Sequence, residues 1–177
     1  ALMVDGFRQL GYKNVIQYQP KRLSEGYGFH ASVVEDLKRE GVSLILTIDV
    51  GITAFEAVEK ANELGIQVII TDHHQMQETL PPAFSVVNPN RADDESGLGY
   101  LCGAGVAFYV LRALKRELFN RQLISESTLD LKSLLDAFTI GTLTDMVPLV
   151  GDNRVLIKHG LSVLENTQRH GLRALLD

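Results

Sequence analysis

The sequence predicts an α/β fold, in which a parallel sheet is flanked by helices and followed by a helical C-terminal part. In the first half, three apolar runs of strand length alternate with helical patterns, at residues 42–49, 67–71 and 84–87. In the second half every periodic segment is helical. A strand, a helix and a second strand in this order are typical of a right-handed βαβ unit, which makes neighbouring strands parallel.

Three helices are predicted in the first half from the spacing of apolar residues, at residues 1–10, 31–40 and 53–64. A further short strand is predicted at residues 15–18, where Pro20 ends it, and residues 21–30 are expected to form a loop. Thr53, followed by Glu56 three residues later, is typical of a capping box and would begin the third helix.

Four helices are predicted in the second half, at residues 103–120, 131–140, 153–164 and 172–176. The first begins with Gly103-Ala104-Gly105, small residues that would let it approach another backbone closely. Asp130 is the expected N-cap of the second helix. The polar residues 91–99 are expected to form an exposed loop.

Length and composition are those of a globular domain. The chain has 177 residues, of which 45% are hydrophobic and 22% charged. Its net charge of −5 argues against a surface that by itself attracts nucleic acid, although bound metal ions would reverse the potential of an acidic site. The single Cys102 cannot form an internal disulfide, is expected to be buried, and points to a reducing cytoplasm. No secretory leader and no membrane-spanning apolar run is visible.

Acidic residues and histidines follow several of the predicted elements. Asp49 ends one strand, Asp72, His73 and His74 follow the next, and Asp145 follows an apolar helix. Because ligands of open α/β sheets bind outside the carboxyl ends of the strands, these side chains are candidates for one site. Imidazole and carboxylate are suitable ligands for Mn²⁺, Fe²⁺ or Zn²⁺.

The same residues have simpler interpretations. Asp49 and Asp145 could be capping or turn residues. His73 and His74 are adjacent and would point to opposite sides of an extended backbone, so we expect one metal ligand and one phosphate or water contact. Asp72 could bind metal or orient a ligating histidine. The remaining histidines are expected at the surface, namely His30, His159 and His170.

A carboxylate after one strand and Asp-His-His after the next suit a dinuclear site. Two ions there would polarise a phosphoryl oxygen and lower the pKa of a water for in-line attack. The sequence lacks the His-Glu-x-x-His and paired-cysteine motifs of zinc proteins, the Gly-x-Ser-x-Gly elbow of serine hydrolases, and the Gly-Lys-Ser/Thr of P-loops.

Three segments resemble the second, third and fourth motifs of the DHH phosphoesterase superfamily, namely residues 47–52, 71–74 and 141–149. Five others are similar to the RecJ family of single-stranded-DNA exonucleases within it, namely residues 22–28, 87–90, 102–109, 153–154 and 160–161. The resemblance covers nearly the whole chain and implies a DHH phosphoesterase-like fold.

The resemblance also implies roles for the candidate residues. Asp49 would bridge two Mn²⁺ or Mg²⁺ ions, His73 and Asp145 would be metal ligands, and the catalytic residues Asp72 and His74 would support the site and the scissile phosphate. The activity would be hydrolysis of single-stranded DNA from its 5′ end in recombination and repair. The enzyme would be cytoplasmic and separate from membranes, with a single-strand-binding protein or a helicase as possible partners.

Two departures from the family concern the ends of the chain. The first motif, Asp-x-Asp-x-Asp-Gly, is absent, and Asp5-Gly6 lies within a helical pattern and does not replace it. The C-terminal substrate-binding domain is absent as well. Within the chain, Val50 stands where many relatives have Asn. We therefore expect residues 1–177 to be a truncated DHH catalytic domain that is inactive alone. The alternatives are a DHH phosphodiesterase acting on short oligonucleotides or cyclic dinucleotides, and a catalytically dead binding module.

Overall fold

The computed structural model describes residues 1–20 and 26–176. The chain forms two compact units. The sheet unit runs from Tyr18 to Gly99, and the helical unit contains residues 1–17 and the chain from Tyr100 onward. The predicted loop at residues 21–30 lies partly outside the described residues.

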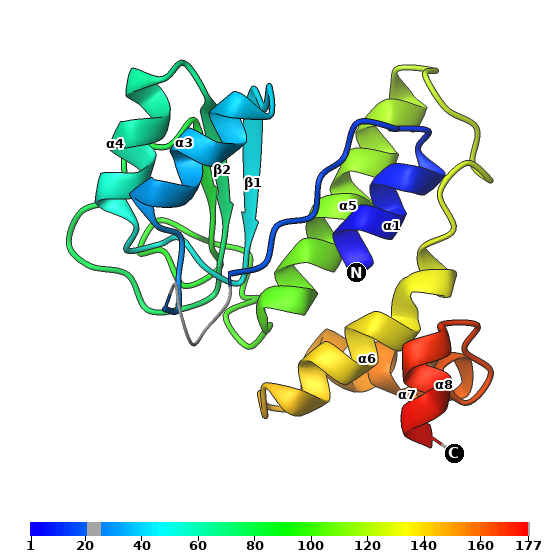
Figure 1. Cartoon of the computed structure of the whole chain (residues 1–177). Helices are drawn as coiled ribbons and strands as arrows, with labels where there is room; N and C mark the ends of the chain where they lie inside the picture. Colours follow the sequence, from blue (N-terminus) through cyan, green and yellow to red (C-terminus); the bar gives the residue numbers. More distant parts are fainter. Residues whose placement is uncertain (21–25, 177) are drawn as a thin grey trace. The chain divides into compact units, whose positions relative to one another are not determined.

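The sheet unit contains a parallel sheet with the strand order β1-β2-β3. Its strands are β1 (Leu44–Ile48), β2 (Gln67–Thr71) and β3 (Ser85–Val87). Two helices, α3 (Ala31–Arg39) and α4 (Phe55–Glu63), lie side by side on one face of the sheet (Figure 1). The strands are rich in Ile, Val and Thr, whose branched side chains suit a pleated surface. The predicted α/β class and the parallel pairing are confirmed.

The core of the sheet unit lies between this face and the two helices. Ile45, Val68 and Ile70 contribute the strand side. The helix side is formed by Val33, Val34, Leu37, Ala57, Val58 and Ala61. Burying one aliphatic side chain of this size stabilises a fold by roughly 1.5–3 kcal/mol. The packing holds β1 and β2 in register, so that the loops after Ile48 and Thr71 leave the same edge of the sheet.

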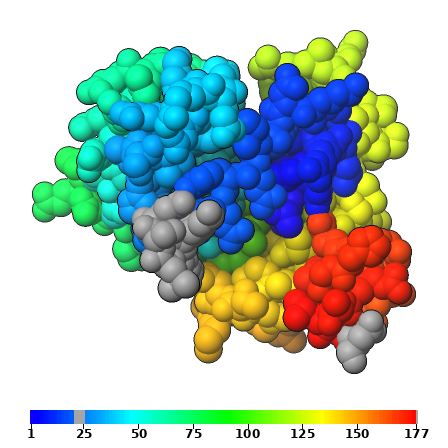
Figure 2. Space-filling view, viewed as in Figure 1, coloured from blue at the N-terminus to red at the C-terminus, as the bar shows by residue number. Residues whose placement is uncertain are grey.

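The helical unit consists of α1 (Leu2–Gln9), α5 (Gly103–Asn120), the 3₁₀ turn η1 (Leu131–Leu134), α6 (Leu135–Thr144), α7 (Gly151–Glu165) and α8 (His170–Leu176). Helix α6 packs against both α5 and α7, and α1 packs against α5. Helix α8 has no buried residue and lies at the surface (red in Figure 2). Within the described residues, no helix combines the length and the apolar character that a membrane span requires.

Small residues mark the points where these helices cross. A Cβ on Gly141 of α6 would lie 2.5 Å from the Cβ of Ala104 in α5, which confirms the close approach expected from the small-residue start of α5. A Cβ on Gly160 of α7 would lie 1.9 Å from Thr139 Oγ1 in α6. Cys102, the N-cap of α5, is 1% exposed, so its predicted burial is confirmed.

Replacing Gly160 with Ala should destabilise the protein by roughly 1–3 kcal/mol, the usual cost of overpacking. Helix propensity alone would favour Ala by about 1 kcal/mol, so the sign of the change depends on the contact with Thr139. Gly171→Ala is the matched control, because a Cβ there meets no atom within 4 Å. It should raise stability by at most about 1 kcal/mol. Urea unfolding of both variants measures the difference, and equal losses would contradict the packing argument.

The predicted strand at residues 15–18 is wrong. Residues 12–20 form neither helix nor strand, and Ile16 is 54% exposed. A strand needs a neighbour that accepts and donates its backbone hydrogen bonds. In the described part of the chain the sheet contains only β1, β2 and β3, none of which pairs with this segment.

The predicted capping box at Thr53 is also wrong. Helix α4 begins at Phe55, and its N-cap is Ala54, which makes no side-chain cap. The Ala54 N–H donates to Gly51 O at 3.0 Å, so a turn occupies the residues that the prediction assigned to the first helical turn. Asp130 does act as a cap, since it accepts a hydrogen bond from Lys132 N at 3.0 Å, although the segment starts as η1 and α6 continues to Thr144.

Asp5 has a structural role in the helical unit. Arg169 is hydrogen-bonded to Asp5 in α1 and to Asp136 in α6, whose side chain is only 4% exposed. Burial alone would lower the pKa of Arg169, but the hydrogen bonds to the two carboxylates outweigh burial and raise it. The prediction that Asp5 lies inside a helix is thus confirmed.

Candidate functional site

The loop after β1 sets the position of the Asp49 side chain at the edge of the sheet. The Asp49 N–H still donates to Thr71 O, at 2.9 Å, but the φ of Asp49 is 64°, in the left-handed region that Asp tolerates better than most residues. Gly51 follows with a φ of 117°, and a Cβ there would lie 2.8 Å from Thr47 Oγ1. Only glycine fits a loop that folds back this closely over the strand end.

Asp72 connects this loop to the loop after β2. Its carboxylate is 1% exposed and accepts hydrogen bonds from Ile52 N at 2.9 Å, His73 N at 2.8 Å and His74 N at 3.2 Å. Burial raises the pKa of a carboxyl group, but here these hydrogen bonds and the one with the His74 ring outweigh burial and lower the pKa of Asp72. The charged carboxylate is therefore a fixed anchor for both loops.

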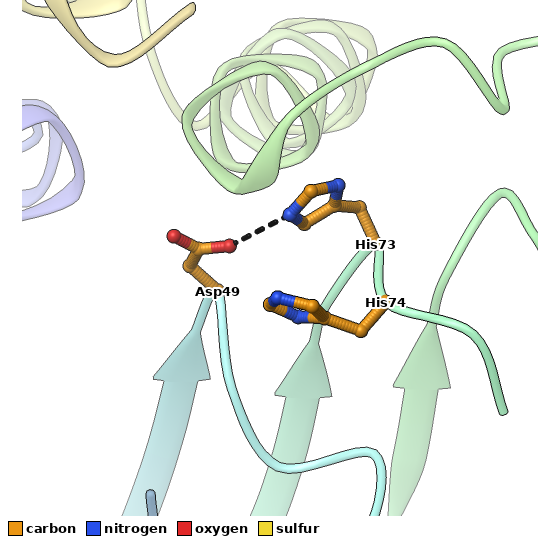
Figure 3. A group of neighbouring side chains, drawn as sticks. All are labelled: Asp49, His73 and His74. Atoms are coloured by element: carbon orange, nitrogen blue, oxygen red, sulfur yellow. Dashed lines mark ion pairs between the residues drawn. The ribbon is translucent and has the colours of Figure 1, made fainter. Parts of the chain in front are cut away.

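His73 and His74 both face Asp49 (Figure 3). His73 Nε2 lies 3.0 Å from Asp49 Oδ1, and the centroids of the two imidazole rings are 4.5 Å apart. The prediction that the two side chains point to opposite sides is wrong. The prediction assumed an extended backbone. Strand β2 instead ends at Thr71, and the next two N–H groups form a turn in which both donate to the Asp72 carboxylate.

These three residues fit a divalent metal ion. Asp49, His73 and His74 each offer one ligand atom, and the atoms lie within 4.8 Å of one another. Two ligands that are each roughly 2.0–2.2 Å from a common ion lie at most roughly 4.4 Å apart, so small side-chain rotations would let all three atoms bind one ion. His74 Nδ1 lies 2.7 Å from Asp72 Oδ1, which favours a proton on Nδ1 and a lone pair on Nε2. Among residues 1–20 and 26–176 this is the one group with such an arrangement.

Asp145 is the C-cap of α6 and belongs to the helical unit. The loop that follows it is held by Asn153, which is 0% exposed and donates to Pro148 O at 3.0 Å and to Tyr100 O at 2.9 Å. The predicted convergence of Asp145 with Asp49 would join the two units, and it stays a prediction.

Tyr109 on α5 contributes a pH-dependent contact to the same unit, because its hydroxyl donates to Asp152 on α7. Burial and Asp152 raise the pKa of Tyr109 to about 12. A raised folded-state pKa adds stability that is fully present below the unfolded value of about 10 and is lost as the pH rises from there through 12. A tyrosinate absorbance component near pH 12 should disappear in Tyr109→Phe. It should remain in Tyr12→Phe, which removes an exposed ring.

The remaining histidines are only partly as predicted. His159 and His170 are exposed, which confirms the prediction for them. His30 is half-buried as the N-cap of α3, and its Nε2 is inaccessible to solvent, so its assignment to the surface is wrong. It lines a cavity of about 270 Å³ together with Val50 and Gly51, because the turn before α3 packs against the loop after Asp49.

Two asparagines that the sequence reasoning did not assign to the site contact it directly. Asn88 Nδ2 donates to His74 O at 2.9 Å, and Asn90 Nδ2 donates to His73 O at 2.5 Å. The sequence contains a pattern that could have indicated them, because Asn-Pro-Asn follows the third strand as Asp49 and Asp72 follow the first two. Parallel pairing brings all three strand ends to one edge.

Known proteins are similar to this chain in sequence and in structure. The chain is 41% identical, over its whole length, to the single-stranded-DNA-specific exonuclease RecJ of Salmonella typhimurium, and 40% identical to that of Escherichia coli. It covers 31% of each relative, so it spans about a third of their length. A crystal structure of exonuclease RecJ bound to manganese superposes with a TM-score of 0.82 at 36% identity, covering 98% of this chain and 42% of that one.

The family itself is identified by a match that covers most of the chain. The DHH family, N-terminal domain, matches residues 1–142, a range that contains β1 to β3 and the residues Asp49, Asp72, His73 and His74. The chain therefore belongs to the DHH family.

Proposed function

We propose that this chain is the DHH catalytic domain of a longer enzyme that degrades single-stranded DNA from its 5′ end in recombination and repair. The observation that carries the proposal is the meeting of Asp49, His73 and His74 at the carboxyl edge of a parallel sheet. It is supported by the 41% identity to a RecJ exonuclease. A DNA substrate and a single unpaired cysteine suit the reducing cytoplasm.

Asp49, His73 and Asp145 would hold Mn²⁺ or Mg²⁺, and the manganese-bound RecJ structure supports a divalent ion of this kind. Bound ions would polarise the scissile phosphate and activate water, which is the usual role of paired metals in nucleases. Asp72 would hold His73 and His74 in place through its hydrogen bonds, so that His74 reaches the substrate phosphate. His74 suits this contact because its side chain is 49% exposed, against 14% for His73.

The test is to incubate the full-length protein and Mn²⁺ with single-stranded DNA labelled at its 5′ end. The proposal expects early release of labelled mononucleotide, with little release from blunt duplex DNA or from strands labelled at the 3′ end. Cleavage of dinucleotides or cyclic dinucleotides, with long single strands left intact, would instead identify a phosphodiesterase of small substrates. Binding of DNA without any hydrolysis would identify a non-catalytic module.

We also propose that residues 1–177 alone are inactive. The chain spans 31% of the RecJ relatives, and its net charge of −5 provides little attraction for a DNA backbone. Purified residues 1–177 should release fewer nucleotides from labelled single-stranded DNA with Mn²⁺ than the full-length protein, by several orders of magnitude. Comparable release by the two proteins would show that the chain carries a complete site.

A further inference from the structure

The turn after β3 holds the main chain of the two histidines. Asn88 and Asn90 donate their side-chain amides to the carbonyl oxygens of His74 and His73, at 2.9 and 2.5 Å. Within the turn, Asn88 Oδ1 accepts a hydrogen bond from Asn90 N at 2.8 Å, and Arg91 N donates to Asn88 O at 3.2 Å. Asn88 is 2% exposed, and both the nitrogen and the oxygen of its side-chain amide are hydrogen-bonded inside the protein.

The position of this turn follows from the sheet. Strands β2 and β3 are parallel, and Asp72 N donates to Val87 O at 3.1 Å, which extends the pairing one residue past Thr71. Beyond that point the side chains of Asn88 and Asn90, instead of a strand backbone, donate hydrogen bonds to the main chain of the histidines. The peptide between His73 and His74 is held at both ends, with its carbonyl bonded to Asn90 and its N–H to Asp72. The directions of both imidazoles then depend only on their own side-chain torsions.

We propose that Asn88 and Asn90 are positioning residues of the candidate metal centre. They fix the carbonyl side of the His73–His74 main chain, as Asp72 fixes its N–H side, so that both rings face Asp49. The inference rests on the proposed function in taking His73 as a metal ligand, and it adds His74, whose ring also faces Asp49, as a further ligand of the same ion. Groups that orient metal ligands from behind change metal affinity or activity by roughly 10–100-fold when they are removed.

Gly99 provides an independent way to move Asn90. A Cβ on Gly99 would lie 2.7 Å from Asn90 Oδ1, and its other neighbours are at least 3.6 Å away. The backbone of Gly99 is outside the left-handed region, so alanine fits its conformation. The added methyl group of Gly99→Ala therefore displaces the Asn90 amide from His73 O, while both asparagines remain in the sequence.

The experiment measures Mn²⁺ binding to the full-length protein by electron paramagnetic resonance, which counts free ions and does not depend on turnover. Asn88→Ala and Asn90→Ala should raise the Kd for Mn²⁺ by roughly 10–100-fold, at a temperature where circular dichroism shows both variants folded. Asn62→Ala is the matched control, because Asn62 also donates its amide to a backbone carbonyl, Pro82 O at 2.8 Å, in the same unit. Its Kd should stay within twofold of wild type.

Gly99→Ala should raise the Kd in the wild-type background and add nothing in the Asn90→Ala background, because both changes break the same contact. A folded Asn90→Ala protein with a wild-type Kd, or additive effects in the double variant, would overturn the positioning role. Failure of the proposed function has a different signature. The wild-type protein would then bind Mn²⁺, and the Kd values of the variants would still follow the expected order, but single-stranded DNA would not be degraded.

Discussion

Asp49→Asn should abolish nuclease activity in the full-length protein and weaken Mn²⁺ binding. Asn is nearly isosteric with Asp and also tolerates the left-handed φ of 64°, so the loop after β1 should keep its shape. The variant removes the negative charge that faces His73 Nε2 at 3.0 Å. We expect the rate to fall by more than the roughly 100-fold that follows from losing a supporting residue.

Asp93→Asn is the control for this prediction. It makes the same chemical change in the sheet unit, at a carboxylate that is 67% exposed and paired with Arg91. Its activity and its Mn²⁺ affinity should match those of the wild-type protein. An active, folded Asp49→Asn enzyme would remove the candidate metal centre from the mechanism.

Asp145→Ala should also abolish activity, yet leave the fold intact. Asp145 is exposed at the C-terminal end of α6, where a negative charge opposes the helix dipole at a cost of roughly 0.3–1 kcal/mol. Loss of turnover together with a Tm close to that of wild type is the result that supports its role as a metal ligand.

Glu126→Ala, which removes another exposed carboxylate of the helical unit, should change neither quantity. Near-normal nucleotide release by a folded Asp145→Ala protein in Mn²⁺ would contradict the assignment. It would also remove the reason to expect Asp145 beside Asp49.

The elements that follow local patterns were predictable from the sequence. The bounds of β2 and α5 agree with the prediction, because a short apolar run and a long amphipathic run are both local patterns of the sequence. The candidate residues Asp49 and Asp72 were found for the same reason, as polar residues directly after buried strands. The predicted strand at 15–18 failed because a strand also needs a partner, which a local pattern does not reveal.

The sequence by itself determined the parallel α/β architecture and which carboxylates and imidazoles lie at the edge of the sheet, because the periodicity of apolar residues and the ends of strands are local properties. Only the tertiary structure decided that His73 and His74 face the same way. The histidine main chain there donates to the Asp72 carboxylate and accepts from the amides of Asn88 and Asn90, residues that come from two strand ends. The direction of a side chain in a loop is set by such long-range contacts, and spacing along the chain does not encode them.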